Sequence, residues 1–272
     1  MRGESSKEAF GTGTETHSNR RAALTAGVLF VTATVTNVIG TGLSRSLLEG
    51  SDYLTAVSSH ANRVAAGALL ELIAAAASVG IAIALYPVLK KWGSSLALGS
   101  VVFRTAEAVM YMISVVSLLS LLALSQRFTS AVAADPASFR TVGDSFIDVR
   151  EQAALVGVFA FSVGGFLYYC LFYRSWLVPR WLSGWGIGAV ILMFLACLLA
   201  LFRQNALTTY TILALPIGVQ EMVLAVWLIA KGFSPPARSG APVEDRRSDG
   251  PRAVGEVDVG DRPGPVRVGR RP

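Results

Sequence analysis

The sequence predicts an all-α, polytopic membrane protein built as a bundle of six transmembrane helices. Of its 272 residues, 53% are hydrophobic and only 15% are charged, and the mean hydropathy is +0.53. The apolar residues are gathered into runs of about 20 or more, the length that a helix needs to cross the ~30 Å hydrocarbon core of a bilayer. The alternating ~10-residue segments that mark an outer-membrane barrel are not visible.

The composition divides the chain into three regions. Residues 1–19 are polar and predict a disordered N-terminal arm, which lacks the apolar core of a cleaved signal peptide, so we expect the first span to direct insertion. Residues 20–233 form the six-helix transmembrane domain. Residues 234–272 are rich in Pro, Gly and Arg, and predict a disordered C-terminal tail because they hold too few large apolar side chains to order themselves.

The six predicted spans cover residues 22–43, 64–86, 96–124, 152–172, 181–202 and 206–230. The first follows Arg20 and Arg21, and the second is closed by Pro87, Lys90 and Lys91. Tryptophans and Tyr173 around the fourth and fifth spans suit an aromatic belt at one interface.

The first span is rich in small and hydroxyl-bearing residues, which permit close approach of helices: Gly27, Thr32, Thr36, Asn37 and Gly40. This pattern favours a packing face, and the alternative is a face that lines a substrate path.

Two connections are long enough to hold helices of their own. In the first, Asp52 predicts the cap of a short helix that buries Tyr53, Leu54 and Val57 at the membrane surface. In the second, Asp135 followed by proline predicts a helix start, and apolar residues recur at helical spacing up to Val149. We expect a short amphipathic helix that lies on the membrane and leads into the fourth span.

Six spans place both termini on one side of the membrane. The connections on that side are short and purely basic (Lys90 and Lys91, then Arg174 and Arg180), whereas the opposite loops are longer and mix arginines with acids. The positive-inside rule therefore predicts a multi-pass protein of the cell membrane with both termini in the cytoplasm.

Ionisable residues lie deep within three spans. At ~1.5 Å per residue from the cytoplasmic end, Arg104 lies ~12 Å deep, Glu107 ~17 Å, Glu221 ~14 Å and Glu71 ~20 Å. Arg104 and Glu107 share a helical face because residues three apart are neighbours. We therefore predict one buried polar cluster of Glu71, Arg104, Glu107, Gln220 and Glu221.

Charge counting leaves this cluster with three carboxylates and one guanidinium. A buried carboxylate without a cation takes up a proton, so at least one glutamate is expected to be neutral, and Glu71 is favoured because it lies furthest from Arg104. Two interpretations stay open. The cluster holds the helices in register in a structural, sensor or partner-binding protein. Alternatively, its glutamates serve a small secondary transporter or a proton-coupled carrier.

Other chemistry has little support in the sequence. The spans hold no zinc-protease motif, no phosphate-binding glycine loop and no nucleophile with its base, so no enzyme, cofactor or metal is expected. Cys170 and Cys197 lie within spans, where a disulfide framework is not expected. The basic residues flank apolar runs or lie in the tail, so they indicate topology rather than nucleic-acid binding, and the bilayer is the expected partner.

Four segments carry a resemblance to a known family: residues 69–91 (LLELIAAAASVGIAIALYPVLKK), 96–109 (LALGSVVFRTAEAV), 168–188 (YYCLFYRSWLVPRWLSGWGIG) and 215–233 (LPIGVQEMVLAVWLIAKGF). Together they resemble the bacterial membrane family known as domain of unknown function 4386, over about residues 20–233. The resemblance implies an integral membrane protein without an assigned activity. It also implies that Glu71, Arg104, Glu107, Gln220 and Glu221 belong to the family's pattern.

Overall fold

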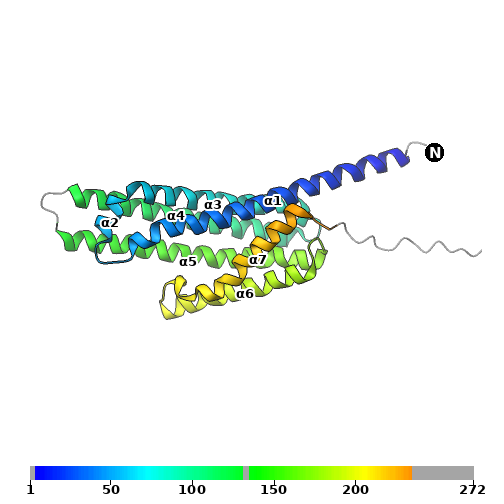
Figure 1. Cartoon of the computed structure of the whole chain (residues 1–272). Helices are drawn as coiled ribbons and strands as arrows, with labels where there is room; N and C mark the ends of the chain where they lie inside the picture. Colours follow the sequence, from blue (N-terminus) through cyan, green and yellow to red (C-terminus); the bar gives the residue numbers. More distant parts are fainter. Residues whose placement is uncertain (1–3, 131–134, 235–272) are drawn as a thin grey trace, which may run out of the picture. The chain divides into compact units, whose positions relative to one another are not determined.

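A computed structural model describes residues 4–130 and 135–234, which lie in one compact unit. This part of the chain is helical and holds no strand. Its elements are α1 (Glu4–Leu48), α2 (Tyr53–Ser59), α3 (Ala61–Leu89), α4 (Ser94–Ser130), α5 (Pro136–Ser175), α6 (Arg180–Arg203), the 3-10 helix η1 (Leu207–Tyr210) and α7 (Thr211–Ala230) (Figure 1). Six of the described helices are long and apolar enough to cross a membrane, so the predicted fold class is confirmed.

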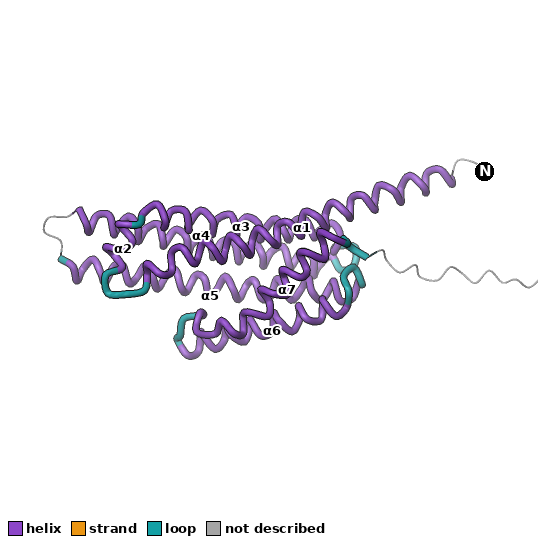
Figure 2. Tube along the Cα trace, in the orientation of Figure 1, coloured by secondary structure: helices purple, strands orange, loops and turns teal. Residues whose placement is uncertain are grey.

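The six long helices pack as a ring. Along the chain α3 contacts α4, α4 contacts α5, α5 contacts α6 and α6 contacts α7, while α1 lies between α3 and α7 and closes the ring. Figure 2 shows α1, α3, α4, α5 and α6 running side by side along the bundle, with α7 inclined to them and loops at the ends of the bundle. We call the end with the α3–α4 and α5–α6 turns the proximal end, and the end with α2 the distal end.

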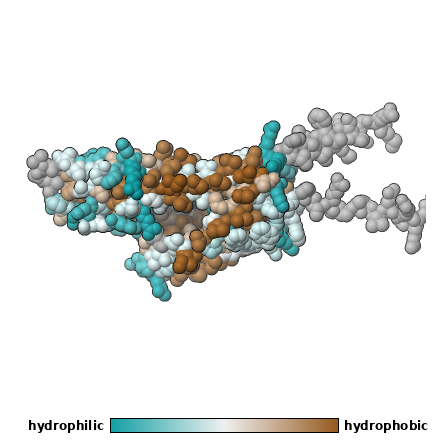
Figure 3. Space-filling model, viewed as in Figure 1, coloured by the Kyte–Doolittle hydropathy of each residue, from teal (hydrophilic) through white to brown (hydrophobic). Residues whose placement is uncertain are grey.

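The long helices differ in length. α6 and α7, with 24 and 20 residues, match one crossing, whereas α4 and α5 have 37 and 40 residues. At ~1.5 Å per residue α4 and α5 exceed the ~30 Å hydrocarbon core, and Figure 1 shows that they continue beyond the α6–α7 turn at the distal end. Exposed apolar side chains form a band over the middle of the bundle, with hydrophilic residues at both ends (Figure 3).

α1 begins at Glu4, ahead of the first span, and the disorder predicted for the arm of residues 1–19 stays a prediction. One segment differs from the sequence prediction. The amphipathic segment after Asp135 does not lie on the membrane, because α5 runs without a break through Val149 into the fourth span. The predicted tail of residues 234–272 lies, apart from Ser234, outside the described residues.

A small cap of α2 and the distal parts of α4 and α5 replaces the expected surface helix. α2 buries Tyr53, Leu54 and Val57, as predicted, but Asp52 makes no capping hydrogen bond from its side chain. The Tyr53 hydroxyl donates to Asp144 Oδ1 at 2.8 Å and lies 3.1 Å from the carbonyl oxygen of Arg140. Leu54 packs with aromatic side chains of α4 and α5, so this apolar face is covered by protein rather than by lipid.

The tyrosine of this cap gives a pH-dependent prediction. Burial, then the hydrogen bond and the charge of Asp144, raise the pKa of Tyr53 above its ordinary value of 10.0. The neutral phenol is therefore favoured in the folded state, and its stabilising contribution is lost as the pH rises above about 10. We expect Tyr53→Phe to cost about 1 kcal/mol near neutral pH. Thermal melts should show a smaller decline for the variant than for the wild type above about pH 10; equal declines would contradict this.

Glycines allow a close contact between α1 and α3. A Cβ on Gly67 of α3 would lie 2.9 Å from the carbonyl oxygen of Gly40 on α1, and a Cβ on Gly40 would lie 2.9 Å from the carbonyl oxygen of Gly67. The two backbones approach so closely that neither position has room for a side chain. The predicted packing face of the first span is confirmed at Gly40.

This contact predicts opposite effects of two glycine substitutions. Gly67→Ala should destabilise the protein by at least about 1 kcal/mol, because overpacking pushes α1 away from α3. Gly42→Ala is the matched control, since a Cβ there meets nothing within 4 Å. The control should gain about 0.5–1 kcal/mol because alanine favours the helix. Melting temperatures in detergent test the pair, and a stabilised Gly67→Ala variant would refute the contact.

Candidate functional site

The structure holds two separate polar clusters. The first, the Arg104 cluster, is made of Ser78, Arg104, Glu107, Tyr168 and Glu221 from α3, α4, α5 and α7. The second, the Arg150 cluster, is made of Ser44, Glu71, Ser114 and Arg150 from α1, α3, α4 and α5. Glu71 does not join Arg104, because it lies ~27 Å from the end of α3 whereas Arg104 lies ~15 Å from the start of α4.

The Arg104 cluster is buried within the packed bundle. Arg104 Nη1 lies 3.1 Å from Glu107 Oε2, and the two side chains are only 3% and 4% exposed. The Arg104 guanidinium also stacks over the ring of Phe161, 4.9 Å from its centroid. Gly164 of α5 lets the arginine approach, since a Cβ there would lie 3.3 Å from Arg104 Cγ.

Three more side chains face this pair. Glu221 of α7 and Tyr168 of α5 lie within the electrostatic reach of Arg104, and Ser78 of α3 neighbours Glu107. The structure therefore brings together Arg104, Glu107 and Glu221, three of the five residues in the predicted cluster.

Gln220 has a different environment. It is fully buried, its Oε1 accepts a hydrogen bond from the Tyr169 hydroxyl, and its Nε2 donates to the carbonyl oxygen of Leu182 at 3.2 Å. These contacts join α5, α6 and α7. Gln220 therefore acts in packing beside the Arg104 cluster rather than within it.

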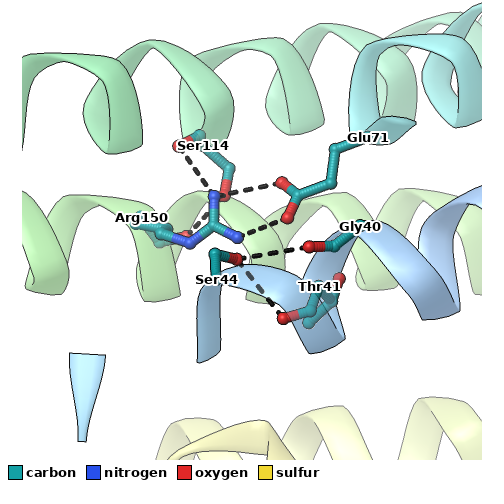
Figure 4. A network of polar contacts seen from close by, with 6 residues as sticks. All are labelled: Gly40, Thr41, Ser44, Glu71, Ser114 and Arg150. Atoms are coloured by element: carbon teal, nitrogen blue, oxygen red, sulfur yellow. Dashed lines mark hydrogen bonds and ion pairs between the residues drawn. The ribbon is translucent and has the colours of Figure 1, made fainter. Parts of the chain in front are cut away.

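The Arg150 cluster is built around a bidentate ion pair. Arg150 Nη2 lies 2.6 Å from Glu71 Oε1, and Nη1 lies 3.0 Å from Glu71 Oε2. Nη1 also donates to the carbonyl oxygen of Ser114 at 3.2 Å, and the Ser114 hydroxyl donates to the carbonyl oxygen of Arg150 at 3.2 Å (Figure 4). Because the planar guanidinium and carboxylate form two parallel hydrogen bonds, this ion pair is stronger than one with a single contact.

The ion pair with the Arg150 guanidinium changes the charge that is expected for Glu71. The sequence favoured Glu71 as the neutral carboxyl because it seemed furthest from a positive charge. In the structure Arg150 balances that charge, so charge counting now leaves one carboxylate in excess among Glu107 and Glu221.

The Arg150 cluster borders a cavity of about 510 Å³. Its walls come from α1, α3, α4, α5, α6 and η1, and they combine charged groups with apolar ones such as Val158, Met193 and Leu207. Arg45 and Glu49, whose side chains are 51% and 67% exposed, lie at its rim, so the cavity reaches the surface. The volume lies within the range of small-molecule sites, about 300–1,000 Å³.

The course of α7 leaves room for this cavity. In the proximal half α7 touches α1, where a Cβ on Gly27 would lie 2.9 Å from the carbonyl oxygen of Ala225. Towards the distal end α7 crosses away from α1 and lies beside α6 (Figure 1), and Val38 of α1 and Leu215 of α7 are 65% and 63% exposed. The ring is therefore tight at its proximal half and open at its distal half, where Figure 3 shows a hollow.

Residues 25–232 match a family described as a domain of unknown function (DUF4386). The chain belongs to this family. Comparisons with curated proteins and with solved structures found no match.

The part of the chain that matches DUF4386 contains both polar clusters and every cavity-lining residue. Within residues 4–130 and 135–234 of this DUF4386 member, no three His, Cys, Asp or Glu side chains are placed to hold a metal ion.

Sequence reasoning missed Arg150, Ser114, Tyr168 and the cavity of this DUF4386 protein. Arg150 stands just ahead of an apolar run, where an arginine usually marks the end of a span. One signal was available: Arg150 follows, by about four turns, a helix start at Asp135, so a continuous helix would have placed it beside the outer part of its neighbours.

Proposed function

We propose that the protein is a carrier for a small polar solute in the cell membrane, with both termini in the cytoplasm and the cavity as its solute site. The observation that carries the proposal is the cavity of about 510 Å³ that reaches the Glu71–Arg150 pair from the surface. Ionisable groups within membrane spans commonly mark solute or ion pathways, and here one such pair borders a cavity.

The lining favours a solute with both charges. Glu71 and Arg150 stand side by side and are 8% and 11% exposed, so a zwitterion can exchange its carboxylate and ammonium for the partners within the pair. The apolar walls offer contacts for a short side chain. In this proposal no bond of the solute is broken, and the partners of the protein are the bilayer and the solute, not nucleic acid.

The direction of opening follows from the basic residues. The proximal end carries Lys90, Lys91, Arg174 and Arg180, so the positive-inside rule places it in the cytoplasm. The cavity then opens to the outside. Towards the proximal end the bundle is filled by a buried apolar core that includes Phe30, Tyr168, Tyr169 and Phe172. This arrangement corresponds to an outward-open carrier.

The test is uptake by proteoliposomes. Purified protein is reconstituted and offered a labelled mixture of the proteinogenic amino acids as zwitterionic probes. We expect accumulation above that of empty liposomes, and loss of at least about tenfold in Glu71→Gln and Arg150→Gln, since a charged hydrogen bond contributes on the order of 1.5–3 kcal/mol. Arg140→Gln, which removes an exposed charge from the distal cap, is the control and should transport normally. Uptake unaffected by all three substitutions would refute the proposal.

The Arg104 cluster favours a second, structural role. Arg104 and Glu107 are buried, Arg104 stacks on Phe161 of α5, and Glu221 approaches from α7, so the cluster connects helices on opposite parts of the ring. Such contacts contribute on the order of 0.6–2 kcal/mol each within membranes. In this role the cluster keeps the helices in register for sensing or partner binding. Substitutions at Glu221 then lower the stability of the protein, and the molecules that remain folded take up solute as the wild type does.

A further inference from the structure

The Arg104 cluster contains most of the unpartnered polar atoms in the described structure. Seven buried side-chain nitrogen or oxygen atoms there have no hydrogen-bond partner among the described residues, and all except Trp227 Nε1 belong to this cluster. They are Ser78 Oγ, Arg104 Nε, Tyr168 Oη and Glu221 Oε1, together with Arg104 Nη1 and Glu107 Oε2, which face each other at 3.1 Å in the ion pair but are not aligned as a hydrogen bond. Folded proteins leave few such atoms, so their concentration here marks the cluster as a place where a further polar or charged species can bind.

The charge of the cluster identifies that species. Glu107 and Glu221 face one guanidinium, and the other groups around them are tyrosines and a cysteine that carry no charge near neutral pH: Tyr111, Tyr168, Tyr169 and Cys197. Two ionised carboxylates would leave one negative charge uncompensated. Burying such a charge costs at least several kcal/mol. One added positive charge removes this cost.

A proton suits the site better than a metal ion. Arg104 lies 3.1 Å from Glu107 and would repel a second cation, and the cluster offers only two carboxylates. A proton needs no ligand sphere. It also supplies one O–H donor to a cluster in which Glu221 Oε1 makes no hydrogen bond.

Tyr111 connects this cluster to the cavity. It stands one helical turn beyond Glu107 on α4, it interacts electrostatically with Arg104, Glu107 and Glu221, and it also lines the cavity wall. Tyr111 therefore belongs both to the wall of the cavity and to the surroundings of the Arg104 cluster, and its hydroxyl group can accept one hydrogen bond and donate another.

We propose that the Arg104 cluster is a proton-binding site, in which Glu107 and Glu221 share one exchangeable proton that arrives from the cavity past Tyr111. A hydronium ion in the cavity gives up its proton and leaves as water, and one carboxylate becomes a carboxylic acid. Use of this proton to drive solute movement rests on the carrier function proposed above, but the site itself does not.

Infrared spectroscopy of the membrane-reconstituted full chain near neutral pH tests the site without any solute. The wild type should show the C=O stretch of one carboxylic acid per chain, which shifts in D₂O. Glu107→Gln and Glu221→Gln should each abolish the band, because Arg104 then neutralises the single carboxylate that is left. Glu71→Gln, which changes the other cluster, should keep it. Tyr111→Phe should retain the band and slow its shift in D₂O.

The outcomes separate the two proposals. Absence of the band in the wild type, its persistence in Glu107→Gln or in Glu221→Gln, or its loss in Glu71→Gln would overturn the proton site, and one of the two cluster variants suffices if the other fails to fold. An unchanged exchange rate in Tyr111→Phe would overturn the route past Tyr111. If the band behaves as expected and the proteoliposomes take up no amino acid, the carrier proposal fails and the proton site stands.

Discussion

Replacing Arg104 by leucine is expected to destabilise the protein by about 3–5 kcal/mol near neutral pH, the cost of breaking a buried ion pair by removing one partner. The side chain is almost completely buried, lies 3.1 Å from Glu107 and is the guanidinium that faces Glu221. Without it both carboxyls must be neutral or remain as unpaired charges in a dry environment. The loss in the free energy of unfolding should be smaller at about pH 5 and below, because the two carboxyl groups then take up protons more readily.

Unfolding in a titration with sodium dodecyl sulfate, followed by tryptophan fluorescence, measures this effect. Arg127→Leu is the matched control, because it removes an exposed arginine from the same helix and should change the free energy of unfolding by less than about 0.5 kcal/mol. The double variant Arg104→Leu/Glu107→Leu should be more stable than Arg104→Leu, since it buries one charge fewer. An Arg104→Leu variant that resembles the control would show that the ion pair does not hold the helices together.

The sequence was sufficient for the membrane fold and for part of this cluster. Runs of apolar residues locate all six spans because hydrocarbon excludes polar backbone and side chains in the same way along the whole chain. Arg104 and Glu107 were predictable as a pair because their spacing of three depends only on helix geometry. Both predictions use only the local sequence, and neither depends on which helices are neighbours in the bundle.

The predictions that were wrong concern which helices are neighbours and where they end, and hydropathy does not determine either. Gln220 and Glu221 are adjacent, and at 3.6 residues per turn adjacent side chains point ~100° apart, so they face different neighbours. α5 continues beyond the membrane because protein in the distal cap covers its apolar side, as Leu54 does for Phe139 and Phe146. Because this continuation of α5 was not predicted, Arg150 was assigned to a loop, and its ion pair with Glu71 was not predicted either.

Removing Glu71 should cost less stability than removing Arg104, which distinguishes the two clusters. Glu71→Leu leaves Arg150 without its carboxylate, but this arginine borders the cavity and keeps its hydrogen bond to the carbonyl oxygen of Ser114. We therefore expect a loss of about 2 kcal/mol in the free energy of unfolding, smaller than for a fully buried pair. The double variant Glu71→Leu/Arg150→Met should recover most of it, with a coupling energy of about 1–3 kcal/mol between the two sites.

The same variants separate packing from solute binding. If the ion pair serves only to hold α3 against α5, the double variant regains stability and every function that depends on the fold. If the pair is the solute site, the double variant is stable yet takes up no amino acid, because the charges that would exchange partners with a zwitterion are gone. Recovery of both stability and uptake in the double variant would contradict the carrier proposal. A coupling energy near zero would instead contradict the bidentate contact between Glu71 and Arg150.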